Sequence, residues 1–109
     1  MRLTFIETHL FRVSMKGVLD DDDMRELGDT LLEDPEAGDL IPRAGGARKI
    51  RRALDGGGKS GGVRVVYFYH NEADRVYYLL VYPKNVAVNI SEAGRKTLKD
   101  SIRQIKGEE

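Results

Sequence analysis

The sequence predicts one small domain that combines α-helices with antiparallel β-strands. Four aspartates at residues 20–23 precede leucines that are spaced as on one face of a helix. Residues 63–70 and 75–82 are rich in Val, Tyr, Phe and Leu and are separated by four residues, which is typical of a hairpin. Ser91 can cap a final helix, because the apolar residues that follow it again have helical spacing. A chain of 109 residues is long enough to form one core.

The first twenty residues allow two interpretations. Residues 3–8 favour a strand, which could extend to Leu10. The residues after it fit either a short helix with one apolar stripe or a longer strand that runs to Val13, and periodicity alone does not choose between them.

The next element is predicted to be a helix that begins at the aspartates. Asp20 to Asp23 supply a side-chain cap and negative charge, both of which stabilise a helix N-terminus. We therefore interpret this acidic run as a helix start and not as a metal site. Pro35 and Gly38 end the helix.

The middle of the chain is predicted to hold a loop, a strand and a glycine turn. Residues 40–46 contain Pro42 and a glycine pair and read as the loop. Residues 47–54 alternate as a strand does, and residues 55–62 hold five glycines and form the turn.

Four cations follow one another closely on the strand predicted at residues 47–54. Because side chains of a strand alternate between its faces, Arg48 and Arg52 share one face and Lys49 and Arg51 share the other. Only one of these pairs can therefore face a given nucleic-acid backbone. We identify all four as candidate RNA-binding residues.

Charge is distributed unevenly along a chain whose net charge is zero. Residues 1–42 carry a net charge of −7 and residues 43–109 carry +7. The excess is densest between Arg43 and Arg64, where seven Lys or Arg stand beside a single acid. This pattern indicates a domain with two different faces and a basic surface that suits a polyanion, of which a phosphodiester backbone is the commonest.

Several function classes lack the residues that they require. There are no cysteines, and the two histidines lie far apart in sequence, so no metal or cofactor is expected. No apolar run has membrane-spanning length and no signal peptide is recognisable, so we expect a cytoplasmic protein without a membrane partner. Gly58-Lys59-Ser60 is not part of a P-loop, because Ala53 stands where that motif requires glycine and a strand follows.

Four segments resemble the RelE/HigB superfamily of bacterial toxins from type II toxin–antitoxin systems. They are DPEAGDLIP at 34–42, GGARKIR at 45–51, GKSGGVRVVY at 58–67 and LLVYPKN at 79–85. The resemblance covers nearly the whole chain and implies one toxin domain over residues 1–109. It implies an α+β fold in which N-terminal helices and a C-terminal helix pack on a small antiparallel β-sheet.

The resemblance also implies an activity and a set of partners. Members are metal-independent endoribonucleases that cleave mRNA on the translating ribosome and thereby inhibit translation. A cognate antitoxin neutralises them, and in HigA-like pairs this antitoxin carries a helix-turn-helix domain. Contact with DNA is expected only through that antitoxin.

The residues present suit RNA cleavage, in which the 2′-hydroxyl of the substrate is the nucleophile. By resemblance, Arg64 matches the active-site arginine that follows the glycine turn, and a guanidinium can hold a phosphate through two parallel hydrogen bonds. Lys59 and Lys84 are candidates for added positive charge and proton transfer. Tyr82 can stack on a base or donate its hydroxyl proton.

One position departs from the family pattern. Some members carry a catalytic tyrosine just before the C-terminal helix, where this chain has Ile90. The chain also has no catalytic histidine, and two alternatives to the nuclease stay open. One is a catalytically silent module that binds RNA or the ribosome, and the other is a regulatory protein whose basic face docks an acidic partner.

Overall fold

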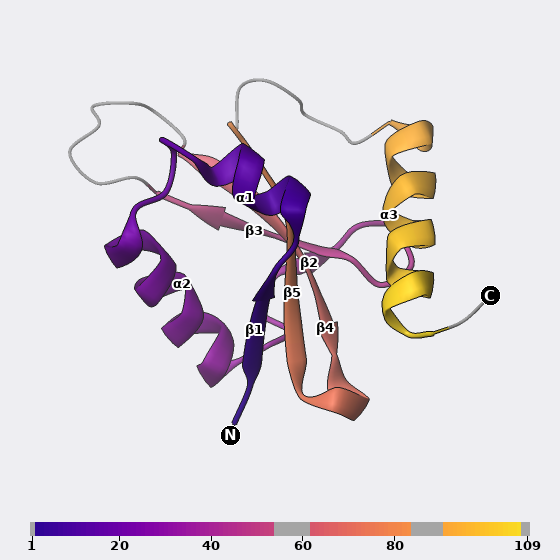
Figure 1. Ribbon diagram of the computed structural model, residues 1–109, viewed down its shortest axis with the longest axis horizontal. Coiled ribbons are helices and arrows are strands. Elements are labelled where there is room, and N and C mark those ends of the chain that lie inside the picture. Colours follow the sequence, from indigo (N-terminus) through magenta and orange to yellow (C-terminus); the bar gives the residue numbers. More distant parts are fainter. Residues whose placement is uncertain (1, 54–61, 84–90, 108–109) are drawn as a thin grey trace.

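Five strands form one sheet in the described part of the chain, and helices cover both of its faces (Figure 1). The computed structural model describes residues 2–53, 62–83 and 91–107. The strand order is β1-β5-β4-β3-β2. The elements are β1 (Thr4–Glu7), α1 (His9–Met15), α2 (Asp21–Glu33), β2 (Asp39–Leu40), β3 (Arg48–Arg52), β4 (Val63–His70), a 3-10 turn (Asn71–Ala73), β5 (Arg75–Pro83) and α3 (Glu92–Ile105). None of these helices is both long and apolar enough to cross a membrane.

The first strand ends early and a short helix follows it. β1 stops at Glu7, and the hydroxyl of Thr8 caps α1 by accepting a hydrogen bond from the Phe11 amide. The helical interpretation of this segment is confirmed, and both the extension of the first strand to Leu10 and the strand to Val13 are wrong. The helix is favoured over the strand because it buries the apolar stripe: Phe11 is fully buried on the helix face that contacts the sheet.

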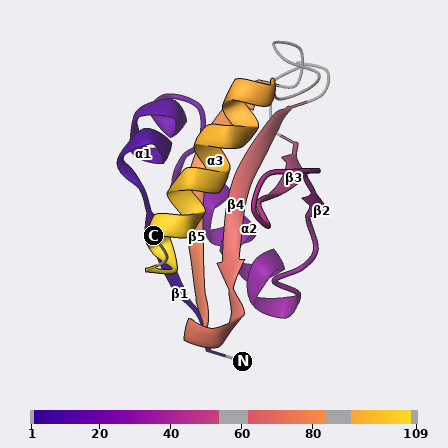
Figure 2. The ribbon, with the colours of Figure 1, turned by 90° about the vertical axis from the view of Figure 1, so that its right-hand side faces the viewer.

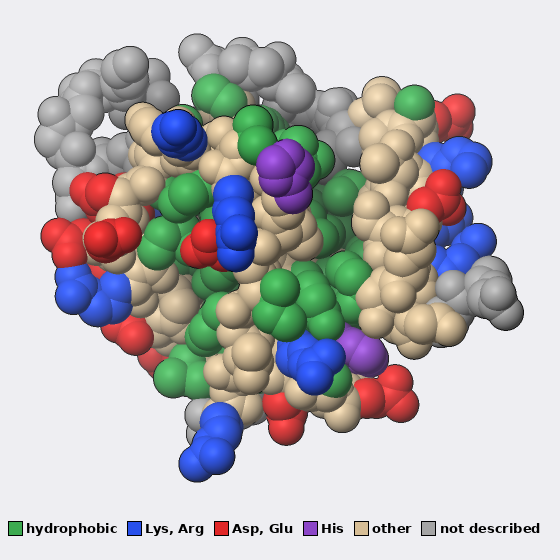
Figure 3. Space-filling model, viewed as in Figure 1, with side chains coloured by type: hydrophobic (Ala, Val, Ile, Leu, Met, Phe, Trp, Pro, Cys, Tyr) green, Lys and Arg blue, Asp and Glu red, His purple; other side chains and the backbone are tan. Residues whose placement is uncertain are grey.

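The acidic run is the helix start that the sequence predicts. Asp20 and Asp23 form a capping box, in which each carboxylate accepts a hydrogen bond from the other residue's amide. α2 then buries Leu27 and Leu31 against the sheet, and it ends at Glu33, two residues before Pro35. Figure 3 shows Asp and Glu side chains gathered over this helix, whereas the outer side of α3 carries both acidic and basic side chains.

The α+β fold is confirmed, with two details that the sequence did not predict. The sheet is mixed, because β1 pairs with β5 in parallel while the other pairs are antiparallel. In addition, the predicted loop at 40–46 begins within a short strand, since Asp39 and Leu40 pair with β3. These strands have four and two residues, so their pairing comes from neighbours in space more than from their own patterns.

β4 is buried on both sides, and its residues alternate between two cores. Val63, Val65 and Tyr67 pack with α1 and α2, whereas Val66 and Phe68 pack with Leu98 and Ile102 of α3. Figure 2 shows α3 lying across this second face. We call the two sides the α2 face and the α3 face. Because alternation is strict on this strand, Arg64 belongs to the α3 face.

The hydroxyl of Tyr67 ties the segment after α2 to the centre of the sheet. It donates a hydrogen bond to the Pro35 carbonyl (2.9 Å) and accepts one from the Gly38 amide (2.9 Å). Burial raises the pKa of this fully buried hydroxyl. A Cβ at Gly38 would lie 2.8 Å from the Tyr67 ring and 2.9 Å from the Lys49 carbonyl, so only glycine fits there.

We expect Tyr67→Phe to lower the free energy of unfolding by about 1–3 kcal/mol, because it leaves a buried carbonyl and a buried amide without partners. Urea denaturation measures the change. Tyr69→Phe on the same strand is the matched control, since its hydroxyl has no hydrogen-bond partner in the described ranges, and its stability should stay near that of the wild type. If the wild type, Tyr67→Phe and Tyr69→Phe are equally stable, the hydroxyl of Tyr67 does not anchor the segment after α2.

Candidate nucleic-acid interface

Three of the candidate side chains stand side by side across the three central strands. Arg51 of β3 is the register partner of Arg64 of β4, and Arg64 is in turn the partner of Tyr82 of β5. Side chains of directly paired residues project from the same face, with their Cβ atoms about 5 Å apart. We call this set the cationic row. The structure thus brings together three of the predicted site residues.

The cationic row lies on the α3 face, at one end of the sheet. Arg64 has the same parity as Val66 and Phe68, and Tyr82 packs against the core cluster that contains them. Lys49 is the partner of Val66 and therefore lies on this face as well. This face thus carries a row of cations and one phenol, set at the edge of an apolar core.

The guanidinium of Arg64 is partly enclosed, and one of its donors has no partner. Its Nη1 atom is buried and makes no hydrogen bond to any of the described residues. An ionised donor that is removed from water without an acceptor is costly, so this position favours an anionic ligand. A phosphate oxygen is an acceptor that suits a guanidinium.

The hydroxyl of Tyr82 is held in its protonated form. Burial raises its pKa, and the nearby positive charge of Arg64 offsets part of that rise. The second effect is consistent with the strand register, in which Arg64 and Tyr82 are direct partners. At neutral pH this hydroxyl is therefore neutral and can donate a proton or a hydrogen bond.

Arg48 and Arg52 lie on the opposite face and have partners within the chain. Arg48 donates from Nη1 to the carbonyls of Gly38 (2.8 Å) and Glu36 (3.2 Å), and its Nη2 lies 3.5 Å from the Glu36 carboxylate. Arg52 pairs with Glu26 of α2. These guanidinium groups tie β3 to α2 and to the segment after it. Of the two pairs predicted from the strand, Lys49 and Arg51 are the pair that shares a face with Arg64.

The remaining predicted site residues, Lys59 and Lys84, lie outside the described residues, as does Ile90.

Gly62 is the residue directly before β4. It has a φ of +63°, and a Cβ there would lie 2.1 Å from the Arg52 carbonyl oxygen. Only glycine can take this conformation so close to another backbone. The backbone at the start of β4, two residues before Arg64, therefore depends on this glycine.

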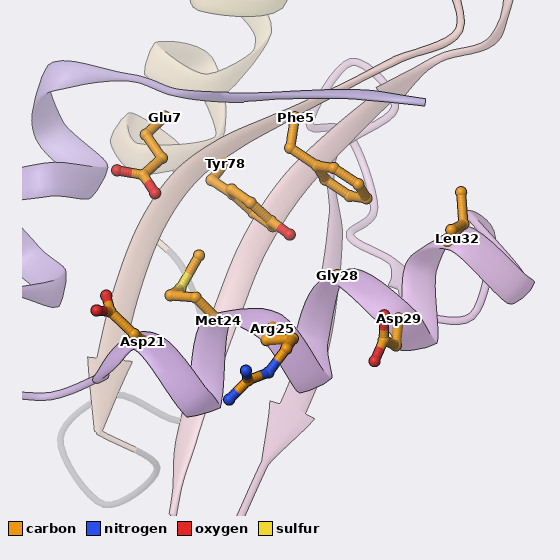
Figure 4. Close-up of a pocket in the computed structure, with 9 residues that line it drawn as sticks. All are labelled: Phe5, Glu7, Asp21, Met24, Arg25, Gly28, Asp29, Leu32 and Tyr78. Carbon is orange, nitrogen blue, oxygen red and sulfur yellow. The ribbon is translucent and has the colours of Figure 1, made fainter. Parts of the chain in front are cut away.

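A hollow on the other face does not suit a polyanion. It lies between α2, β1 and β5, with Phe5 and Tyr78 at its base (Figure 4). Glu7, Asp21 and Asp29 also line it, and their carboxylates would repel phosphate groups. The α3 face is therefore the better candidate for nucleic acid.

Arg95 is a cation on the α3 face that was not among the predicted site residues. Arg95, in the second turn of α3, has a buried Nε atom without a hydrogen-bond partner in the described part of the chain. The sequence could have indicated this residue, because Arg95 stands beside the apolar stripe of the final helix. A cation at such a position is partly enclosed when the helix packs.

Comparison with known proteins finds a family and a fold. A family model described as the RelE toxin of the RelE / RelB toxin–antitoxin system matches residues 5–107. A chain of the intact E. coli RelBE toxin–antitoxin complex has a TM-score of 0.56 and 20% identity, covering 75% of this chain and 96% of its own length. A mutant of E. coli toxin RelE in the free state has a TM-score of 0.55 and 17% identity, covering 94% and 98%. At these identities the two structures are similar to this chain in fold alone.

The division of the β3 cations predicts that their removal affects stability to different extents. Arg48→Ala should lower the free energy of unfolding by about 1–2 kcal/mol, because the carbonyls of Glu36 and Gly38 lose their donor. Arg51→Ala should change it by less than about 0.5 kcal/mol, since Arg51 is exposed and no ion pair holds it in the described ranges. Urea denaturation of the two variants makes the comparison, and an equal loss in both would contradict the assignment of faces.

Proposed function

The chain belongs to the RelE family of toxins from toxin–antitoxin systems, and from this premise we propose that it is a ribosome-dependent endoribonuclease that cleaves mRNA and inhibits translation. The observation that supports this proposal most directly is the cationic row, in which Arg64 holds a buried donor without an acceptor beside the neutral phenol of Tyr82. A guanidinium and a proton donor side by side supply two of the needs of phosphodiester cleavage, which are charge stabilisation and protonation of the leaving oxygen.

In the proposed reaction, which takes place on the ribosome, the reacting groups come from the substrate and this chain. The 2′-oxygen loses its proton and attacks the phosphorus, a 2′-O–P bond forms, and the P–O5′ bond breaks. Arg64 stabilises the negative charge that develops on the phosphorane. Tyr82 donates a proton to the departing 5′-oxygen. The products are a 2′,3′-cyclic phosphate and a 5′-hydroxyl.

The two lysines complete the proposed site. Lys59 and Lys84 add positive charge around the phosphorane, and one of them accepts the proton of the 2′-hydroxyl. A lysine can do this when neighbouring cations lower its pKa. Because Ile90 stands where some family members have a tyrosine, the phenol of Tyr82 takes the role of the donor in this proposal. Lys49 and Arg51 hold the RNA backbone beside the scissile phosphate.

We further propose that a cognate antitoxin neutralises this protein in the cytoplasm. The solved RelBE structure is a toxin–antitoxin complex, and the similar fold supports a partner of that kind for this chain. The resemblance to HigB suggests a HigA-like antitoxin with a helix-turn-helix domain, through which any contact with DNA would be made. A catalytically silent module that binds RNA or the ribosome is the competing proposal, and Ile90 in place of a tyrosine is the observation that favours it.

Induced expression tests the nuclease proposal. The wild-type protein should arrest growth and generate new mRNA 5′ ends, whereas Arg64→Ala should lower cleavage about a hundredfold or more, because a transition-state donor is lost. Arg75→Ala is the control, since Arg75 is an exposed arginine at the start of β5, at the other end of the sheet. Normal growth and intact mRNA at a confirmed level of wild-type protein would sink the proposal. If the Arg64→Ala protein stays fully active, Arg64 is not a catalytic residue.

Binding and chemistry should separate within the site. Lys49→Ala and Arg51→Ala should weaken RNA binding and reduce the slope of log affinity against log salt by about 0.7 each, the value for one phosphate contact on a single strand. Their cleavage rates should recover at saturating protein. Tyr82→Phe, Lys59→Ala and Lys84→Ala should instead lower cleavage at saturation. If every one of these variants shows only a binding defect, the silent module is the better account.

A further inference from the structure

Two arginines on the α3 face share an unusual feature. Arg64 has a buried Nη1 and Arg95 has a buried Nε, and neither atom has a hydrogen-bond partner among the described residues. Arg52 Nε and His70 Nδ1 are also buried without a partner, but Arg52 is ion-paired with Glu26, whereas Arg64 and Arg95 have no ion pair in the described residues. One arginine comes from β4 and the other from α3, so the two features arise in different elements. Buried guanidinium donors without acceptors are costly in a protein with no ligand bound.

The packing of α3 places Arg95 at the same end of the sheet as the cationic row. Leu98 and Ile102 pack on the core cluster formed by β4 and β5. Figures 1 and 2 show that α3 begins at the end of the sheet where β4 begins and β5 ends. Arg95 lies one turn before Leu98, towards that end. Arg64, the second residue of β4, lies there as well.

A close backbone approach shows which side of α3 carries Arg95. The Cα atom of Lys99 lies 3.1 Å from the position that a Cβ on Gly45 would take, so this side of the helix faces the segment before β3. Arg95 precedes Lys99 by four residues and therefore shares that side. Its side chain thus belongs to the half of the face that holds β3 and β4, and not to the side of α3 away from them.

The acids of α3 leave Arg95 without an ion-pair partner. Asp100 accepts a hydrogen bond from Lys96 (3.1 Å), and no salt bridge to Arg95 exists within the described residues. Lys49, Arg51 and Arg64 on the facing strands have no carboxylate within ion-pair distance in those residues either. Asp39 is the register partner of Lys49 and lies on the same face, but no ion pair joins the two in the described residues. Four cations that form no ion pair there favour a ligand that carries repeated negative charge.

We propose that Arg95 is a further RNA-binding residue, whose guanidinium holds the phosphate next to the one that Arg64 holds. This inference rests on the proposed function, because it takes the RNA of that site as the ligand. The helix and the strand then form two walls of one groove, and Arg95 supplies the contact from the helix wall. Arg95 positions the backbone and takes no part in the proton transfers.

The test compares Arg95→Ala with Arg103→Ala, which removes an exposed arginine from the last turn of the same helix. The probe is a single-stranded RNA oligonucleotide with a 2′-deoxy nucleotide at the cleavage site, so that binding is measured without reaction. We expect Arg95→Ala to weaken binding about tenfold at low salt and to reduce the log–log salt slope by about 0.7, whereas Arg103→Ala should match the wild type. Arg95→Lys should keep most of the slope, because it keeps the charge.

Each outcome decides the inference. A salt slope for Arg95→Ala equal to that of Arg103→Ala overturns it, and a slope reduced as predicted supports it. If Arg95→Ala fails to fold, Arg95→Gln, which keeps a long side chain without the charge, decides by the same measurement. If the wild type binds RNA but generates no cleaved ends, the nuclease proposal fails while the slopes still decide the role of Arg95. If the wild type binds no RNA even at low salt, both fail.

Discussion

The burial of β4 on both faces is the constraint on which the rest of the structure depends. Because helices cover the two sides of this strand, its interior positions must be apolar, and they alternate between Val65 and Tyr67 on the α2 face and Val66 and Phe68 on the α3 face. A cation fits only near an end of the strand, where the cover is incomplete. Arg64 occupies such a position, and its face follows from its parity.

The same alternation divides the basic cluster into a half that is paired within the chain and a half that we propose contacts RNA. On the α2 face the neighbouring helix is acidic, and Arg48 and Arg52 find Glu36 and Glu26 there. On the α3 face Asp39 is the register partner of Lys49, but none of Lys49, Arg51 and Arg64 forms a salt bridge among the described residues, so under the proposal their charge serves the ligand. The contrast between the two helices therefore gives the molecule its two faces.

Much of the fold was predictable, because the longer elements carry strong periodic patterns. The capped helix after Asp20, the hairpin of β4 and β5 and the alternation of β3 follow from local residues. The parallel pairing of β1 did not, since its partner strand begins about seventy residues further along the chain. The choice between the two faces of β3 was also beyond the sequence, because it depends on which helix covers each face. Arg95 was not predicted as a site residue, because the helical spacing of Leu98 and Ile102 identifies the buried side of the final helix but not the cations that lie beside it.

The central claim is that RNA contacts the α3 face of the sheet and not the α2 face. NMR of the arginine Nε–Hε groups, recorded while a non-cleavable RNA oligonucleotide is added, reports on each guanidinium separately. The account predicts shifts at Arg51, Arg64 and Arg95 that saturate together, while Arg48 and Arg52 stay unchanged because they are held against the α2 face. Shifts confined to Arg48 and Arg52, or none at any arginine when RNA is bound, would contradict it.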